Sequence, residues 1–183
     1  MLRIDRTFWG ECQEIKVEDD SNGFSVSILP ALGGMVHAFN AVAGGDVIPV
    51  LSSYSDPNNL KSDLGRYFCG AKLFPFPNRI KNGQYEWEGI RHQLPVNFPL
   101  EGNSIHGLVY DQPFILKSSR ADEQSANLEL EYDYAGEKQG FPFPFLIRIS
   151  YRVSQNRIKI TTRVKNTGSR TLPAGDGWHP YFR

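Results

Sequence analysis

Residues 145–164, FLIRISYRVSQNRIKITTRV, carry an apolar side chain at nearly every second position on both sides of a short polar break. Alternation with a period of two is typical of a half-buried β-strand, whose successive side chains point to opposite faces. The break at Ser154, Gln155 and Asn156 has the composition of a turn. We therefore predict an antiparallel hairpin at this place, with one face of each strand in a hydrophobic core.

The same alternation recurs in residues 25–29 and 128–132. Seventeen glycines and twelve prolines interrupt the chain, and no window keeps the 3.6-residue period of a long amphipathic helix. The pattern predicts an all-β protein, an antiparallel β-sandwich formed by one domain, residues 1–183. Three segments are expected to lack regular structure: residues 52–64 as a surface loop, and residues 93–104 and 136–144.

The charges of the chain balance, with 20 basic and 20 acidic side chains. No overall field would attract the protein to nucleic acid or to an anionic membrane, and neither is an expected partner. Residues 1–6, MLRIDR, mix charged with apolar residues and do not have the apolar core of a signal peptide, so we expect a cytoplasmic protein. The two cysteines, Cys12 and Cys69, are far apart and are expected to be reduced.

No metal or cofactor is predicted. None of the four histidines is linked to another by a zinc-type spacing, and the glycine pairs do not form a nucleotide-binding motif. His37 and His92 lie on alternating segments and are interpreted as ordinary strand residues.

Arg79 follows a stiff run, Phe74-Pro75-Phe76-Pro77-Asn78. Each proline fixes one backbone angle, so the run loses little entropy when a ligand binds, and a guanidinium offers several donors to sugar hydroxyls. Asn78 and Arg79 are therefore candidates for substrate binding. The alternative is a turn in which Arg79 pairs with a carboxylate.

Two histidines have more suggestive surroundings. His106 precedes Gly107, which permits positive φ or a close approach of the backbone, and the imidazole is either ligand-facing or structural. His179 lies in the motif GWHPYF, residues 177–182, whose rigid apolar groups would hold the ring in place. Such an imidazole is suited to act as a general acid near neutral pH, and the alternative is a core histidine in an aromatic cluster.

Two neighbours of His179 are further candidates. Asp176 either orients the imidazole or accepts sugar hydroxyls, unless it is a solvated loop carboxylate. Trp178 either stacks on a pyranose face or packs against a neighbouring strand.

These motifs together resemble the aldose 1-epimerase (galactose mutarotase-like) family. The resemblance rests on four segments in the family's order and spans nearly the whole chain: LPALGG at residues 29–34, FPFPNRI at 74–80 with Gly83 and Tyr85, LP at 94–95 followed by NSIHG at 103–107, and GWHPYF at 177–182. It implies the family's large β-sandwich, with Arg79 binding substrate, His106 near the sugar ring oxygen and His179 as the general acid.

The family's general base is a glutamate from a strand well beyond the second histidine motif. The sequence ends at Arg183 and offers no residue to match it, so we expect a sandwich that is incomplete at its C-terminus. The expected function is to interconvert, or only to bind, the anomers of an aldohexose such as glucose or galactose. The alternative is a non-catalytic carbohydrate-binding sandwich that forms a homodimer or pairs with a partner, because uncovered strand edges favour pairing.

Overall fold

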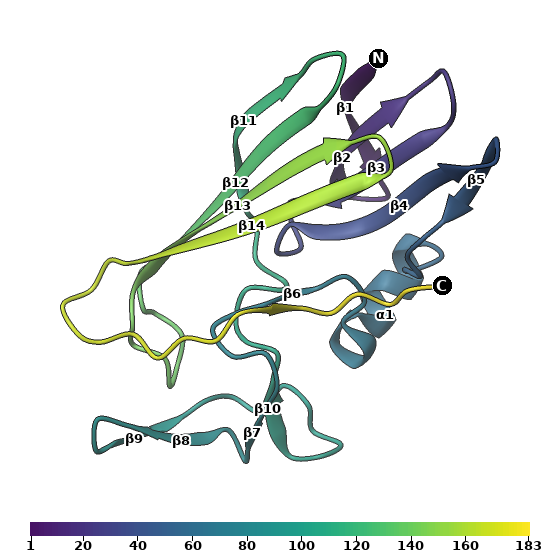
Figure 1. Cartoon of the computed structure of the whole chain (residues 1–183). Helices are drawn as coiled ribbons and strands as arrows, with labels where there is room; N and C mark the ends of the chain where they lie inside the picture. Colours follow the sequence, from purple (N-terminus) through teal and green to yellow (C-terminus); the bar gives the residue numbers. More distant parts are fainter.

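Antiparallel strands form most of the protein. The computed structural model describes all residues, 1–183. A five-stranded sheet contains the first five strands in chain order: β1 (Leu2–Trp9), β2 (Cys12–Asp19), β3 (Phe24–Leu29), β4 (Met35–Ala43) and β5 (Asp46–Pro49). A four-stranded sheet contains β11 (Ile115–Ala121), β12 (Ala126–Tyr134), β13 (Phe145–Ser154) and β14 (Arg157–Asn166) in that order. Figure 1 shows the two sheets side by side. The expected antiparallel sandwich is confirmed.

The predicted hairpin is the β13–β14 pair, in which Ser154 lies opposite Arg157. Asn156 in its turn has a φ of 55°, a left-handed conformation that asparagine tolerates. Its side chain donates to the carbonyl of Val42 on β4 and accepts from the same residue's amide, both at 2.7 Å. The turn is therefore bonded to the opposite sheet as well as to its own.

The core lies between the two sheets. On β13, Phe145, Ile147, Ile149, Tyr151 and Val153 are fully or almost fully buried, while the residues between them are half-buried or exposed. This is the period-two pattern of the sequence, and each such side chain contributes about 1.5–3 kcal/mol when it is fully buried. The buried hydroxyl of Tyr151 donates to the carbonyl of Gly34, which satisfies its hydrogen bond without water.

The prediction of a surface loop at residues 52–64 is wrong, because an α-helix, α1 (Pro57–Tyr67), occupies most of this segment. Asp56 caps its start by accepting hydrogen bonds from the amides of Asn58 and Asn59, at 2.9 and 3.0 Å. Proline at the first helical position after an aspartate is a known start signal. The helix packs on the protein mainly through the buried side chain of Leu60, so its apolar stripe is too narrow to produce a clear 3.6-residue pattern.

Short ladders connect the two sheets to the rest of the chain. β6 (Lys72–Leu73) pairs with β15 (Gly177–Trp178), β7 (Arg79–Lys81) with β10 (Asn103–Ile105), and β8 (Gln84–Trp87) with β9 (Ile90–Gln93). Figure 1 shows the C-terminal segment running back beside β6 towards α1. The segments at 93–104 and 136–144 are irregular over most of their lengths, as expected.

Two further features of the fold bear on its surroundings. Strand β14 forms one edge of its sheet, next to a groove of about 360 Å³ whose lining includes Ile158, Ile160 and Phe182.

The one helix is too short and too polar to cross a lipid bilayer.

Candidate functional site

Three regions that are far apart in the sequence, residues 66–79, 98–106 and 177–181, meet around one cavity of about 460 Å³. The first includes the end of α1, Leu73 of β6 and the run before β7; the second includes the end of β10; the third is β15 with the residues after it. The lining includes neither aspartate nor glutamate. It is formed by Arg66, Tyr67, Phe68, Leu73, Pro77, Asn78, Arg79, Phe98, Ile105, His106, Gly177, Trp178, His179 and Tyr181.

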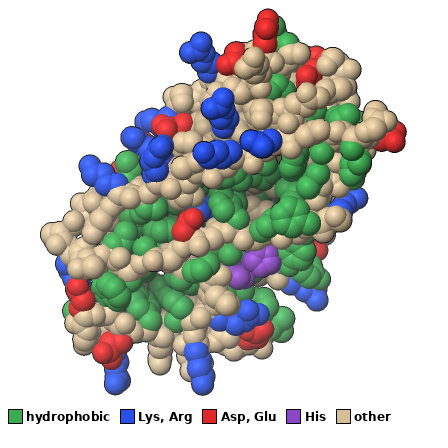
Figure 2. Space-filling model, in the orientation of Figure 1, with side chains coloured by type: hydrophobic (Ala, Val, Ile, Leu, Met, Phe, Trp, Pro, Cys, Tyr) green, Lys and Arg blue, Asp and Glu red, His purple; other side chains and the backbone are tan.

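The two imidazoles lie side by side in this cavity. The rings of His106 and His179 have centroids 4.9 Å apart and meet edge to face. Phe68 packs against both, with its centroid 4.7 Å from His106 and 6.5 Å from His179, and Tyr181 lies 5.2 Å from His179. Figure 2 shows histidine exposed on this face among hydrophobic side chains. The structure therefore brings together the two histidines that the sequence singled out.

Backbone geometry aims His106 into the cavity. Its φ is 62° and that of Gly107 is 83°, so the chain turns through two left-handed residues directly after β10. The amide of His106 donates to the carbonyl of Asn78 at 3.2 Å, which joins the histidine to the rigid proline run. A Cβ atom on Gly107 would lie 2.1 Å from the carbonyl oxygen of Phe74. Both properties expected of this glycine, positive φ and a close approach, are present.

His179 is fixed by its main chain. Its amide donates to the carbonyl of Ala71 at 3.0 Å, and its carbonyl accepts from the amide of Gly70 at 2.9 Å. These bonds continue the pairing of β15 with β6. The position of the imidazole therefore depends on how β15 is held.

Arg79 lies on the cavity wall and also pairs with a carboxylate, which was the alternative interpretation of the sequence. Its guanidinium lies on the cavity wall and also donates to the carboxylate of Glu101, from Nε at 2.6 Å and from Nη2 at 3.2 Å. This contact lowers the pKa of the Glu101 carboxyl. Asn78 accepts a bond from Nη1 at 3.3 Å through its side-chain oxygen, so the arginine is positioned from two sides.

The structure does not bring Asp176 to the cavity, and its expected contacts with sugar or with the His179 ring are not supported. Its carboxylate pairs instead with the ammonium of Lys72. Trp178 does line the cavity, and its indole also lies 4.8 Å from the Lys72 ammonium and 6.4 Å from the ring of Tyr151. The tryptophan thus packs against a neighbouring strand and contributes to the cavity wall as well.

The sequence interpretation missed Arg66, Tyr67, Phe68 and Tyr181. The first three come from the C-terminal end of α1, where Phe68 has a φ of 55° and caps the helix by donating to the carbonyl of Leu64. The Asp56-Pro57 start signal would have predicted the helix, although not which residues face the histidines. Tyr181 belongs to the GWHPYF motif, but the hydrogen bond that its hydroxyl donates to the carbonyl of Tyr67 could not be predicted from the sequence.

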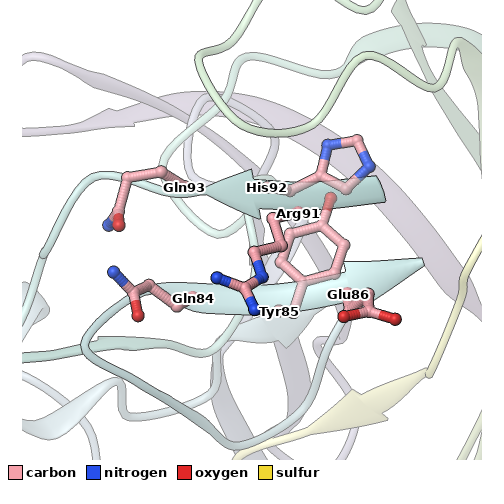
Figure 3. A pocket seen from close by; sticks show the side chains of 6 residues that line it. All are labelled: Gln84, Tyr85, Glu86, Arg91, His92 and Gln93. Atoms are coloured by element: carbon pink, nitrogen blue, oxygen red, sulfur yellow. The ribbon is translucent and has the colours of Figure 1, made fainter. Parts of the chain in front are cut away.

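The other two histidines lie on strands, as predicted. His37 on β4 is buried, with Nδ1 2.9 Å from the hydroxyl of Ser53. His92 on β9 stacks on Tyr85 with ring centroids 4.8 Å apart. Figure 3 shows the side chains of Tyr85 and His92 in a separate pocket on the β8–β9 hairpin. Gln84, Glu86, Arg91 and Gln93 also line this pocket. This pocket lacks the paired imidazoles of the larger cavity.

The environment of His106 predicts a pH effect on stability. Burial, helped by the nearby His179 and Arg79, lowers the pKa of its imidazole. A histidine in the unfolded chain has a pKa of about 6.5. Below that pH the unfolded chain therefore binds a proton that the folded protein does not bind. We expect the free energy of unfolding to fall as the pH drops from about 6.5 towards the lowered pKa of the folded state.

Urea unfolding of the wild type and of His106→Gln across this pH window would measure the effect. The variant should lose less stability on acidification than the wild type. A fall of the same size in both proteins would show that His106 does not contribute.

Comparison with known proteins identifies the family of the chain. The sequence model of the aldose 1-epimerase family matches residues 13–183. The uncharacterized protein YihR of Escherichia coli (strain K12) is 30% identical over 114 residues, which are 62% of this chain and 35% of that protein. A galactose mutarotase-like protein of Clostridium acetobutylicum has a similar structure, with a TM-score of 0.83 and 26% identity, covering 99% of this chain and 54% of that one.

The fold is also that of a galactose 1-epimerase from Lactobacillus acidophilus, with a TM-score of 0.74 at 18% identity over 100% of this chain and 53% of that one. The chain thus spans about half the length of these solved structures. Its family match and its sandwich place it in one class of proteins: the chain belongs to the aldose 1-epimerase family.

Proposed function

We propose that the cavity binds an aldohexose such as glucose or galactose and that His179 acts as the general acid in the interconversion of its anomers. The observation that carries the proposal is the convergence of two imidazoles and Arg79 on one cavity. Its volume of about 460 Å³ lies within the range of small-molecule sites, about 300–1,000 Å³. Family membership supports a sugar as the ligand.

The chemistry assigns a task to each group. Opening a pyranose requires a proton on the ring oxygen and removal of the proton from the C1 hydroxyl; rotation about C1 and closure then give the other anomer. His179 donates the first proton, while Arg79 and Asn78 hydrogen-bond to sugar hydroxyls. Trp178 contributes to the cavity wall, while its indole packs against Lys72 and Tyr151. His106, whose lowered pKa keeps it neutral near pH 7, accepts or donates one hydrogen bond near the ring oxygen.

No general base is assigned in this proposal. The cavity lining offers no carboxylate to take the C1 proton, and no residue of this sequence matches the family's glutamate. A missing acid or base typically costs a factor of about 10²–10⁴ in rate. The alternative to catalysis is binding of the sugar without acceleration.

Polarimetry on freshly dissolved α-galactose and α-glucose tests the activity, with calorimetric titration of the same sugars to measure binding. We expect binding together with equilibration faster than in buffer. Binding without acceleration would favour the non-catalytic carbohydrate-binding protein. Neither binding nor acceleration would contradict the proposed function.

The non-catalytic alternative includes pairing with a second chain. The free edge of β14 and the apolar groove beside it favour such pairing, because an unpaired strand presents a row of hydrogen-bonding groups. Sedimentation velocity at micromolar concentration would detect a homodimer. A monomer at all concentrations would count against self-pairing.

A further inference from the structure

Lys72 carries a charge in the interior of the protein. Its side chain is fully buried, and its ammonium pairs with Asp176, donates to the hydroxyl of Thr162 at 2.8 Å and lies 4.8 Å from the indole of Trp178. Burial lowers the pKa of the lysine, and the Asp176 carboxylate opposes that effect. Because an unpaired buried charge is costly, this set of partners holds the ammonium in one place.

These partners connect three strands behind the cavity. Lys72 lies on β6 opposite Trp178 on β15, while Thr162 comes from β14 of the four-stranded sheet. Successive side chains of a strand point to opposite faces. Leu73, the next residue of β6, accordingly lines the cavity, while Lys72 does not. The ammonium thus lies on the side of the β6–β15 ladder that faces away from the sugar site.

Main-chain bonds hold His179 to Ala71 and Gly70, and the residues after it are bonded as well, but the stretch directly before it is less regular. β15 has only two residues, and the chain before it from 170 to 176 has no regular structure. In that stretch the amide of Gly175 donates to the carbonyl of Pro75 at 2.6 Å. The contacts of Lys72 with Asp176 and Trp178 add side-chain restraint to the pairing of β15 with β6, at the two positions on either side of Gly177 and directly before His179.

We propose that Lys72 is a positioning residue: through Asp176 and Trp178 it sets the place of β15 and thereby the orientation of the His179 imidazole. This role deepens the proposed function and rests on it. Lys72 itself does not touch the sugar. Its effect on turnover or binding is transmitted by His179, which distinguishes it from a lysine that only stabilises the fold.

Lys72→Met is a suitable first variant. Methionine retains an unbranched apolar stem, and replacing a buried ion pair by apolar groups is often neutral for stability. The carboxylate of Asp176, which is 44% exposed, can be hydrated when the lysine is absent. Should Lys72→Met fail to fold, Asp176→Asn weakens the same contact with almost no change of shape, and the expectations below apply to it in the same direction.

A double-mutant cycle with His179→Asn provides the test. In the wild-type background Lys72→Met should reduce mutarotation, or sugar affinity if the protein only binds, by about tenfold or more, since misplacing a catalytic group costs up to about 10²-fold. In the His179→Asn background, where no acceleration is left to lose, the cycle is read in sugar affinity by calorimetric titration, and the same change should alter that affinity by less than about twofold. Equal effects in both backgrounds would overturn the proposal.

The imidazole proton and carbon resonances of His179 give a readout that does not require sugar. We expect Lys72→Met to shift or broaden them while leaving those of His37 unchanged. If the wild type neither binds nor turns over sugar, the proposed function fails, yet this shift still reports whether Lys72 positions His179. Unchanged His179 resonances in a folded variant would contradict the positioning role in either case.

Discussion

Replacing His179 with asparagine should reduce the acceleration of sugar mutarotation to the level of buffer. A positioned general acid contributes a factor of about 10²–10⁴, and the lining of the cavity contains no carboxyl group that could replace it as acid. Asparagine keeps a polar side chain of similar size, and the main-chain bonds of His179 with Ala71 and Gly70 do not involve the ring. The melting temperature should therefore change little.

Polarimetry on α-galactose measures this effect, and His92→Asn is the matched control. His92 stacks on Tyr85 in the separate hairpin pocket, so its loss should leave the rate unchanged. A His179→Asn protein as fast as the wild type would show that the imidazole is not the acid.

Replacing Gly107 with alanine should destabilise the protein by more than about 4 kcal/mol, in the range reserved for severe steric or strain effects. The new Cβ would lie 2.1 Å from the carbonyl oxygen of Phe74 and 2.8 Å from its amide nitrogen. These are backbone atoms that cannot rotate away. Since Phe74 begins the proline run that leads to Arg79, relief of the clash would also move the cavity wall.

Gly89→Ala separates the clash from the backbone strain. Gly89 has a comparable φ of 74°, but nothing lies within 4 Å of the added atom. Its substitution should cost about 1–2 kcal/mol, the price of a left-handed conformation alone. Urea unfolding of both variants measures the difference. Equal losses would mean that the close approach at Gly107 is not a structural constraint.

Local patterns predicted four strands of the two sheets, β3, β12, β13 and β14. The alternation in residues 145–153 arises because one face of β13 is buried and the other is not, and the turn at Asn156 follows from residues that tolerate it. Helix α1 was missed for a physical reason. It buries one residue, Leu60, so periodicity carried little signal, and the cap at Asp56 was the stronger indication.

The candidate site could be predicted only in part. Motif residues with unusual surroundings, such as His106 and His179, could be singled out, and the structure places them 4.9 Å apart. The direction in which the Asp176 side chain points could not be predicted from the sequence. It depends on the pairing of β15 with β6, which joins residues about a hundred positions apart. Such non-local pairing is also what places Phe68 against both imidazoles.

The proposed function requires that His106 and His179 share one sugar-binding cavity. Histidine side-chain NMR during a titration with galactose tests this most directly, because all four imidazoles of the protein report in the same experiment. We predict that the signals of His106 and His179 shift together along one binding curve, while those of His37 and His92 stay in place. Shifts at His92 alone, or at none of the four at saturating sugar, would contradict it.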